Sequence, residues 1–209
     1  ELLRNISWLK DLDDKVFDEL VEQFQNRIFS VDQQIISVDG KDEGLFVIIR
    51  GKVKVIVNKK VVDVLGPGDV VGEMALLTNQ KRTATVTAES PTTTLWISEL
   101  KIRKIFSLAP DIVNQLWLYA SPRFAENVLS NKAPYNGWSQ KQLRDWISKG
   151  ECISMDKNAK FESETQQWIL LTGEAHRTGD KSQKLKSPML MEIGDVISSE
   201  NSKIYVNSI

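Results

Sequence analysis

Residues 68–88 read GDVVGEMALLTNQKRTATVTA, and this stretch decides the fold because a short run of helix formers interrupts a series of strands. Within it, Gly72–Leu77 favours a helix, whereas the flanking residues have the β-branched composition of strands. Just before it, Gly66–Asp69 places proline and glycine at the two central positions of a type II turn. A helix inserted among strands needs a reason, and such local departures are typical of functional sites.

The surrounding pattern predicts an α+β fold, an antiparallel β-roll or jelly roll with flanking helices. Apolar residues at helical spacing predict a helix over 13–25, before the roll. After the roll, Ser98 is a predicted N-cap and Pro110 a first-turn residue of a further helix, which Pro122 is expected to kink or end. The predicted strands cover 34–38, 45–50, 52–57, 60–65, 83–88 and 92–97.

Part of the first half of the chain recurs in the second half, which predicts two copies of one module. Gly44–Gly51 resembles Gln166–Gly173, and Val64–Val70 is echoed by Met191–Val196. The alternative, a chance likeness between two unrelated hairpins, stays open at this point.

The boundary between the modules is predicted from composition. Residues 133–137 read APYNG, which is typical of a linker. We therefore expect one module over 1–132 and a degenerate, truncated second module over 133–209. A helix is predicted over 140–148, and the lysine-rich insertion at 180–186 is expected to be a solvated loop.

Charge and residue usage exclude several classes of function. With 27 basic and 28 acidic residues, the chain has no overall attraction for nucleic acid or anionic lipid. One cysteine, Cys152, and one histidine, His176, cannot form an internal disulfide or a Cys/His metal cluster. No nucleophile or carboxylate is arranged around His176. We therefore expect neither an enzyme nor a metal protein, and a cytoplasmic location fits the cysteine usage.

The chemistry of residues 72–82 follows from their side chains. A helix that begins at Gly72 presents unpaired backbone N–H groups and permits close approach, which favours an anion. Arg82 brings a permanently charged, planar fork to the same anion. The carboxylate of Glu73 would repel an anion unless the ligand also presents hydroxyl donors, as a ribose 2′-OH beside a cyclic phosphate does. Together the three residues predict a sugar phosphate ligand.

This stretch resembles the phosphate-binding cassette of cyclic nucleotide-binding domains, the module of cyclic nucleotide-dependent kinases, nucleotide-gated channels and bacterial transcription activators. By this resemblance, Arg82 and the Ala75 N–H bind the cyclic phosphate, and Glu73 binds the ribose hydroxyl. The likeness covers residues 13–130, and it is broken at Val71, where many members have an aromatic residue and where packing should be looser. The implied cAMP or cGMP site comprises Gly72, Glu73, Met74, Ala75, Arg82, Thr83 and Ala84, and it needs no cofactor.

Two further features bear on the purine base of the ligand. The Thr83 hydroxyl resembles the arrangement in cGMP-responsive kinases and channels, where it can reach the guanine amino group, but a β-branched residue is also expected in a strand. Trp117, Tyr119 and Phe124 lie where the lid helix of the family covers the base. We expect at least two of these three aromatic residues to be core residues instead.

The expected function is a regulatory region that senses cAMP or cGMP and passes binding to an effector or transmembrane domain of the same parent protein. The chain starts at Glu1 without a methionine, so we expect a fragment of a longer protein. The favoured parent is a membrane transporter, such as a sodium/proton exchanger, or an ion channel, with this chain at the cytosolic face.

Other classes of protein were weighed against this one. A scaffold would keep the fold with an empty pocket, in which Glu73 and Arg82 form a surface salt bridge. A regulatory subunit of a cyclic nucleotide-dependent kinase is a further alternative. A transcription activator would need a basic recognition helix, and the chain has little clustered Arg or Lys. No nucleic-acid partner is therefore expected, whereas a homo-oligomer stays open.

The second module is expected to bind no nucleotide, so that each chain takes up one ligand. Aligning Gly194-Asp195-Val196 with Gly68-Asp69-Val70 places Ser198 and Ser199 against Gly72 and Glu73. From Ser198 to the last residue there is no arginine, and Lys203 is the only cation. An anion buried there would lose hydration without a guanidinium to replace it.

Overall fold

The computed structural model describes residues 2–38, 40, 44–162, 166–191 and 196–208. The chain divides into two units, Glu1–Leu116 and Trp117–Ile209, and each unit is described by itself. Among the described residues, no helix is long and apolar enough to cross a membrane.

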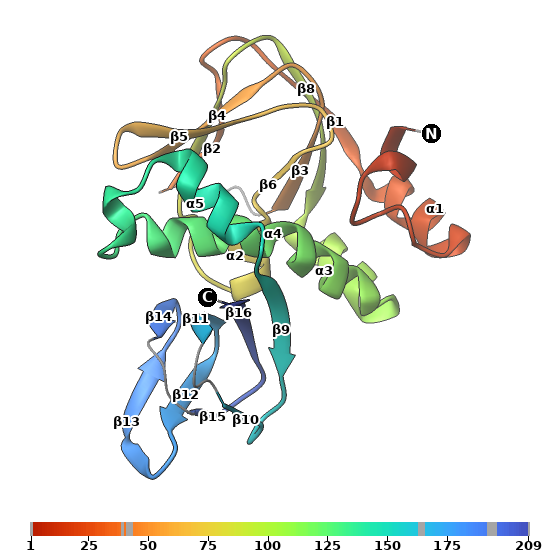
Figure 1. Ribbon diagram of the computed structural model, residues 1–209. Helices are drawn as coiled ribbons and strands as arrows, with labels where there is room; N and C mark the ends of the chain where they lie inside the picture. The colour runs from red at the N-terminus through yellow and green to blue at the C-terminus, as the bar shows by residue number, and fades with distance from the viewer. Residues whose placement is uncertain (1, 39, 41–43, 163–165, 192–195, 209) are drawn as a thin grey trace. The chain divides into compact units, whose positions relative to one another are not determined.

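The first unit is built around an antiparallel β-roll (Figure 1). One sheet has the strand order β1-β8-β3-β6, and the other has the order β2-β7-β4-β5. Its strands are β1 Gln25–Phe29, β2 Gln34–Ile36, β3 Gly44–Arg50, β4 Val53–Val57, β5 Lys60–Leu65, β6 Val70–Val71, β7 Thr85–Ala88 and β8 Thr92–Ser98. Its helical segments are η1 Leu2–Asn5, α1 Asp14–Gln23, α2 Glu73–Thr78, α3 Glu99–Leu108 and the first part of α4 Asp111–Leu129.

The core of this roll lies between its two sheets because alternate residues of a strand point to the same face. Phe46, Ile48, Val53 and Val71 belong to one buried apolar cluster. Val71 is 3% exposed, so valine fills the position where many members of the resembling family have an aromatic residue. The predicted fold class, an antiparallel β-roll with flanking helices, is confirmed.

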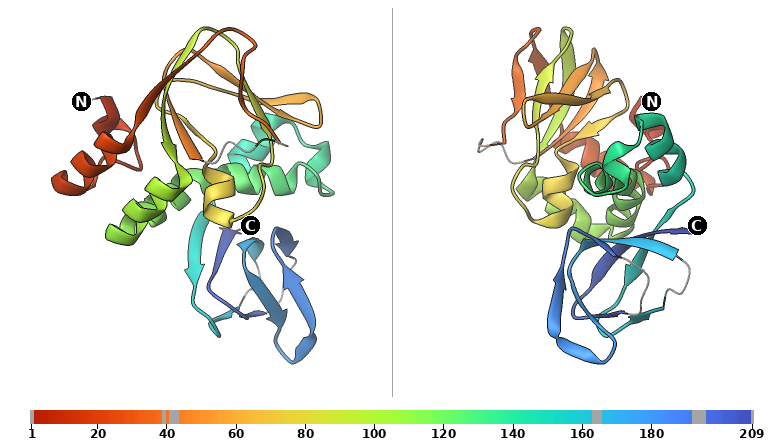
Figure 2. Two further views of the ribbon diagram at one scale, coloured as in Figure 1. Left: turned by 180° about the vertical axis from the view of Figure 1, so that it is seen from behind. Right: turned by 60° about the vertical axis from the view of Figure 1, so that its left-hand side comes forward.

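The N-terminal helix forms where the apolar spacing predicts it. Asp13 caps α1, since its side chain accepts a hydrogen bond from Lys15 N at 3.0 Å. The helix buries Phe17 and Leu20. It packs beside α3 (Figure 2). A helix that precedes the roll in the sequence therefore contacts a helix that follows it.

The strand β1 is an element that the sequence pattern does not predict. Four of its five residues are exposed, and only Phe29 is half-buried. It lies at the edge of its sheet, where it pairs with β8 alone. An edge strand with so little buried surface has no alternation of polar and apolar residues, which is the signal used to predict strands.

The second unit repeats the topology of the first. Its sheets have the orders β9-β16-β11-β14 and β10-β15-β12-β13, and subtracting eight from each label gives the two sheets of the first unit. The prediction of two copies of one module is therefore confirmed. Its strands are β9 Glu151–Met155, β10 Lys160–Phe161, β11 Gln166–Thr172, β12 Glu174–Arg177, β13 Asp180–Lys186, β14 Met189–Met191, β15 Val196–Ser198 and β16 Ser202–Ser208, preceded by η2 Tyr135–Gly137 and α5 Gln140–Ile147.

Strand pairing corrects the alignment of the two modules. Phe46 pairs with Val71, and Trp168 pairs with Met191, so Met191 takes the place of Val71. Ala88 lies opposite Val53. In the same way Ser198 lies opposite Ala175, which places Ser198 at the position of Ala88 and not at that of Gly72. The local Gly-Asp-Val likeness misled the alignment because pairing register is set by whole strands.

The corrected alignment removes the cassette from the second module. Residues 72–87 separate Val71 from Ala88, whereas only 192–197 separate Met191 from Ser198. The connection between β14 and β15 is 192–195, four residues that lie outside the described part of the chain and include Gly194 and Asp195. The spacing is ten residues shorter than in the first module, so it leaves too few residues for both a six-residue helix like α2 and the loop that carries Arg82.

The helix α4 does not end at Pro122, which was one of the two outcomes expected there; a kink at Pro122 stays a prediction. The helix runs continuously from Asp111 to Leu129 with Pro122 inside it. Proline removes the hydrogen bond to the carbonyl of Leu118, and Leu118 is 56% exposed, so water can serve that carbonyl. The two units divide inside this helix, after Leu116.

Two segments expected to be loops are ordered parts of the second unit. The segment predicted as a linker contains Tyr135, which is 3% exposed and stacks edge-on against Trp138 and Trp146. The lysine-rich segment is the strand β13, paired with β12. Lys184 and Lys186 lie 3.4 and 3.3 Å from the Glu174 carboxylate, so two of its lysines form ion pairs across the strand pair.

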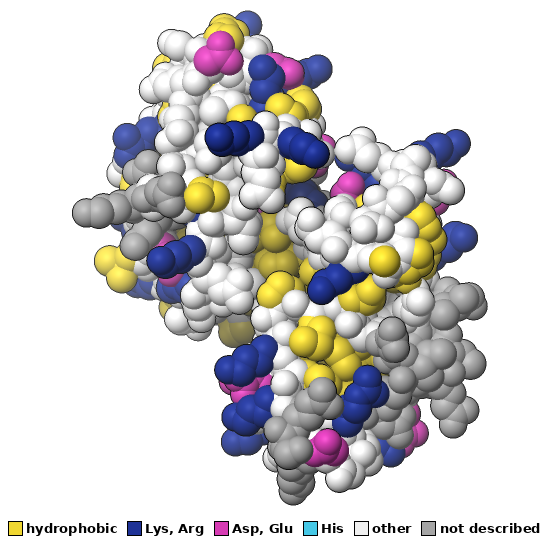
Figure 3. Space-filling view, turned by 90° about the vertical axis from the view of Figure 1, so that its left-hand side faces the viewer, with side chains coloured by type: hydrophobic (Ala, Val, Ile, Leu, Met, Phe, Trp, Pro, Cys, Tyr) yellow, Lys and Arg dark blue, Asp and Glu magenta, His cyan; other side chains and the backbone are white. Residues whose placement is uncertain are grey.

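Charged side chains are distributed in a way that matches the near-neutral composition. On the face drawn in Figure 3, Lys and Arg side chains are scattered among uncharged and hydrophobic ones and do not form one continuous stripe. Proteins that track a nucleic-acid backbone typically gather their basic residues along one face.

Candidate functional site

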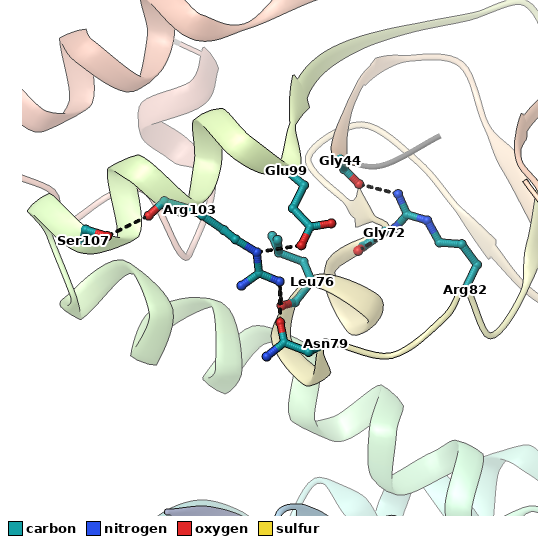
Figure 4. Close-up of polar contacts among 8 residues, drawn as sticks. All are labelled: Gly44, Gly72, Leu76, Asn79, Arg82, Glu99, Arg103 and Ser107. Carbon is teal, nitrogen blue, oxygen red and sulfur yellow. Dashed lines mark hydrogen bonds and ion pairs between the residues drawn. The ribbon is translucent and has the colours of Figure 1, made fainter. Parts of the chain in front are cut away.

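The centre of the candidate site is the guanidinium of Arg82, which lies in the loop between α2 and β7 (Figure 4). Its Nη1 donates to the Gly72 carbonyl at 2.8 Å, and its Nη2 donates to the Gly44 carbonyl at 2.7 Å. Two backbone oxygens from different segments therefore hold the side chain in one orientation. The strand predicted over 83–88 begins two residues later than expected, because β7 begins at Thr85.

Gly72 is the residue that allows this approach. It is the N-cap of α2 with φ 94° and ψ −4°, a left-handed conformation that favours glycine. A Cβ atom placed on it would lie 2.6 Å from the Gly44 carbonyl oxygen and 2.7 Å from Arg82 Nη1. Both the backbone conformation and the space around Gly72 therefore exclude a side chain.

Glu73 is the first residue of α2 and is only 3% exposed. Glutamate is seldom buried to this degree unless its carboxylate has a role or a partner. The position agrees with a carboxylate that faces the interior of a site, and it does not agree with the surface salt bridge of the scaffold alternative.

The remaining predicted residues lie on both sides of Arg82. Met74 and Ala75 are half-buried in the first turn of α2. Thr83 is exposed and Ala84 is half-buried in the loop that leads to β7. The Thr83 hydroxyl lies 4.0 Å from the Met74 sulfur, so the helix start and the loop adjoin each other. Because Thr83 is not in a strand, strand preference does not explain its hydroxyl.

Sequence reasoning missed one contributor to the site, Gly44 at the start of β3. It acts through its backbone carbonyl, which has no side-chain signature. The available signal was a glycine at the edge of a strand, which often marks a close backbone approach. Here a Cβ atom would lie 2.3 Å from the Ile97 carbonyl oxygen and 2.7 Å from the Trp96 indole nitrogen.

The aromatic residues considered for the lid belong to α4. Trp117 and Phe124 are 4% and 6% exposed, and their ring centroids are 5.4 Å apart. The expectation that at least two of the three are core residues is confirmed. Tyr119 is half-buried, and the Arg123 guanidinium lies 4.6 Å from its ring centroid and donates to its hydroxyl.

His176 lies in β12, as expected of a strand residue. Its Nδ1 is 3.2 Å from the Ser199 hydroxyl oxygen. Its buried Nε2 has no hydrogen-bond partner in the described part of the chain. Within the same residues, no group of three or more His, Cys, Asp and Glu side chains could hold a metal ion.

Comparison with known families places this site in context. Residues 27–108 match the model of the cyclic nucleotide-binding domain. The match covers 82 of the 209 residues. It includes all of the roll from Arg27, the helix α2, Arg82 and α3. The predicted cassette therefore lies inside the matched segment.

Known proteins that are similar to part of this chain are of different kinds. The chain is 38% identical over 93 residues to the Pycsar effector protein BcPycTIR of Burkholderia cepacia, an alignment that covers 44% of the chain and 31% of that protein. It is 37% identical over 86 residues to a cGMP-dependent protein kinase of Eimeria tenella, covering 37% of the chain and 9% of the kinase. The chain thus spans less than a third of either relative.

Among solved structures, the protein is similar to the second cyclic nucleotide-binding domain of a PKA regulatory subunit, PKAR CBD2, bound to Sp-2Cl-cAMPS. The TM-score is 0.54 at 21% sequence identity, and the match covers 65% of this chain and 91% of that one. At this identity the similarity concerns the fold, and it agrees with the β-roll described above.

Proposed function

We propose that this chain is a regulatory region whose first module binds cAMP or cGMP at Gly72–Ala84 and passes binding to an effector domain. The observation that carries the proposal is the position of the Arg82 guanidinium, which two backbone carbonyls hold beside the start of α2. A side chain that is already ordered loses little rotamer freedom when a ligand binds. The buried Glu73 supplies the acceptor for a ribose hydroxyl.

The proposed kind of effector domain is based on the kinds of protein to which the relatives belong. One relative is a cGMP-dependent protein kinase and another is a Pycsar effector. Neither is named as a transporter or a channel, so the kinase-type regulatory role is favoured over the exchanger or channel tail expected from the sequence. Two consecutive modules also fit a regulatory region of this type. The role is regulatory and not catalytic, and an effector domain outside this chain is the partner.

The test is titration calorimetry of the whole chain with cAMP and with cGMP. Arg82→Ala should weaken binding by about 100-fold, because a charge-assisted hydrogen bond contributes about 1.5–3 kcal/mol. The affinity of Arg82→Lys should lie between those of the unmodified chain and of Arg82→Ala, since lysine keeps the charge without the planar fork. Glu73→Gln should weaken binding less than Arg82→Ala.

Arg50→Ala is a matched control, because Arg50 is an exposed arginine at the end of β3 in the same module. It should leave the affinity unchanged. The proposal is contradicted if the folded, ligand-free chain binds neither nucleotide, or if Arg50→Ala and Arg82→Ala weaken binding equally. The choice of purine by Thr83 stays a prediction.

A further inference from the structure

One side chain of α3, Arg103, holds the C-terminal end of α2 (Figure 4). Its Nη2 donates to the Leu76 carbonyl at 3.1 Å and to Asn79 Oδ1 at 2.5 Å. Its Nε donates to Glu99 Oε1 at 2.6 Å, one turn earlier on α3. The same guanidinium therefore bonds to both helices.

The helix α2 depends on such contacts because it is short. It has six residues, and the last four carbonyls of any helix lack partners within the helix. Leu76 is one of these four residues, and Arg103 donates to its carbonyl. The Thr78 hydroxyl also donates to the carbonyl of Met74, one turn earlier in the helix, at 2.7 Å. A cation at this end is also favoured by the helix dipole. Asn79 ends the helix in the left-handed conformation, with φ 54° and ψ 28°.

We infer that Arg103 is a positioning residue that transmits occupation of the nucleotide site from α2 to α3. This inference rests on the proposed function. The first turn of α2 carries Glu73 and Ala75, and Arg103 binds Leu76 and Asn79, about 4.5 and 9 Å from Glu73 along the helix. A helix held at both ends moves as one body, so a ligand that displaces its first turn also displaces the carbonyl and the amide that Arg103 binds.

Apolar packing is the rival route between the two helices. Leu76 is 4% exposed, and Ile102 and Ile105 of α3 are buried. Packed side chains tolerate small shifts, whereas a planar guanidinium keeps its three acceptors only in one geometry. The two routes therefore differ in what happens when the donors of Arg103 are removed and the apolar contacts stay.

The experiment is amide hydrogen exchange of the whole chain, with and without saturating cAMP or cGMP, for Arg103→Met. Methionine keeps most of the aliphatic stem and removes every donor. We expect the variant to bind nucleotide and to show the ligand-dependent change in α2, but the change in α3 should fall by roughly tenfold. Arg103→Lys should restore it only in part. Lys101→Met is the matched control, because Lys101 is an exposed cation on the same helix.

A second variant covers the case in which Arg103→Met fails to fold. Asn79→Gly removes one acceptor of Arg103, adopts the left-handed conformation of this position without strain, and leaves α3 intact. Without any nucleotide, it should already speed exchange in α3, which tests the contact independently of binding. If either variant shows the full ligand-dependent change in α3, the inference about Arg103 is overturned and the proposed function is not affected. Absence of nucleotide binding by the unmodified chain overturns the proposed function, and the coupling with it.

Discussion

At the scale of single residues, the geometry of the site depends on the space that a glycine without a side chain provides. Gly72 combines a left-handed conformation with a space that Arg82 and the Gly44 carbonyl fill. Gly68, four residues earlier, has nearly the same φ of 92° but no atom within 4 Å of its would-be Cβ. A side chain at Gly68 would therefore introduce backbone strain alone, whereas a side chain at Gly72 would introduce both strain and steric collision.

This pair gives a prediction about nucleotide affinity. Gly68→Ala should destabilise the fold by about 1–2 kcal/mol through its backbone conformation and leave the affinity for cAMP and cGMP unchanged. Gly72→Ala should cost a similar strain and also displace Arg82, weakening binding by at least about tenfold. Urea unfolding and titration calorimetry measure the two effects. Equal affinities for the two variants would contradict the role given to the space around Gly72.

Residue-scale features differ in how far the sequence predicts them. Gly72, Glu73 and Arg82 were predicted because a glycine, an acid and an arginine at this spacing have side chains with a specific chemistry. Gly44 was not predicted, since a carbonyl leaves no mark in the sequence. Arg103 was not predicted either, because an arginine four residues after Glu99 is equally typical of an exposed helix face.

At the scale of secondary-structure elements, periodicity predicts those with one buried face. The helices α1, α3 and α5 and most strands of the first roll were predicted for this reason. The edge strand β1 was not predicted, because its residues are almost all exposed. The continuity of α4 through Pro122 was also missed, since a local rule about proline cannot include the surroundings that compensate for it.

The junction of α5 with β16 gives a prediction about pH. The Tyr205 hydroxyl donates to the Ile147 carbonyl at the end of α5, and burial raises the pKa of Tyr205 to about 12. An unfolded chain ionises this group near pH 10. The folded state favours the protonated form, so its stabilisation is complete below about pH 10 and is lost as the pH rises to about 12.

Two pKa units correspond to a loss of up to about 3 kcal/mol in the free energy of unfolding over that range. Tyrosinate absorbance in the native chain should show late ionisation, and Tyr205→Phe should remove the step near pH 12. Burial also raises the pKa of Tyr135, so Tyr135→Phe is the control that assigns the step. Ionisation of every tyrosine near pH 10 in the folded protein would refute the anchoring role.

At the scale of the whole molecule, one topology occurs twice and one copy has lost its cassette. Sequence likeness revealed the repeat but misaligned it, because a three-residue match at Gly194 outweighed a deletion that only strand pairing reveals. The second unit keeps what packing requires: Trp168, Leu170, Met191 and Ile204 form its apolar core. A β-roll needs this core to fold, whereas the proposed role of α2 and Arg82 is to bind a ligand.

The loss of the cassette predicts one nucleotide per chain. Between Met191 and Ser198 the second module has ten residues fewer than the first, since 72–87 are sixteen residues and 192–197 are six. Residues 192–197 include no arginine and are too few for both a six-residue helix and the loop that carries Arg82 in the first module, and an anion there would lose hydration without compensation. Titration calorimetry of the whole chain should give a stoichiometry near one, and Arg82→Ala should remove that single site. A stoichiometry near two, or a second site that persists in Arg82→Ala, would show that the second module binds nucleotide by another arrangement.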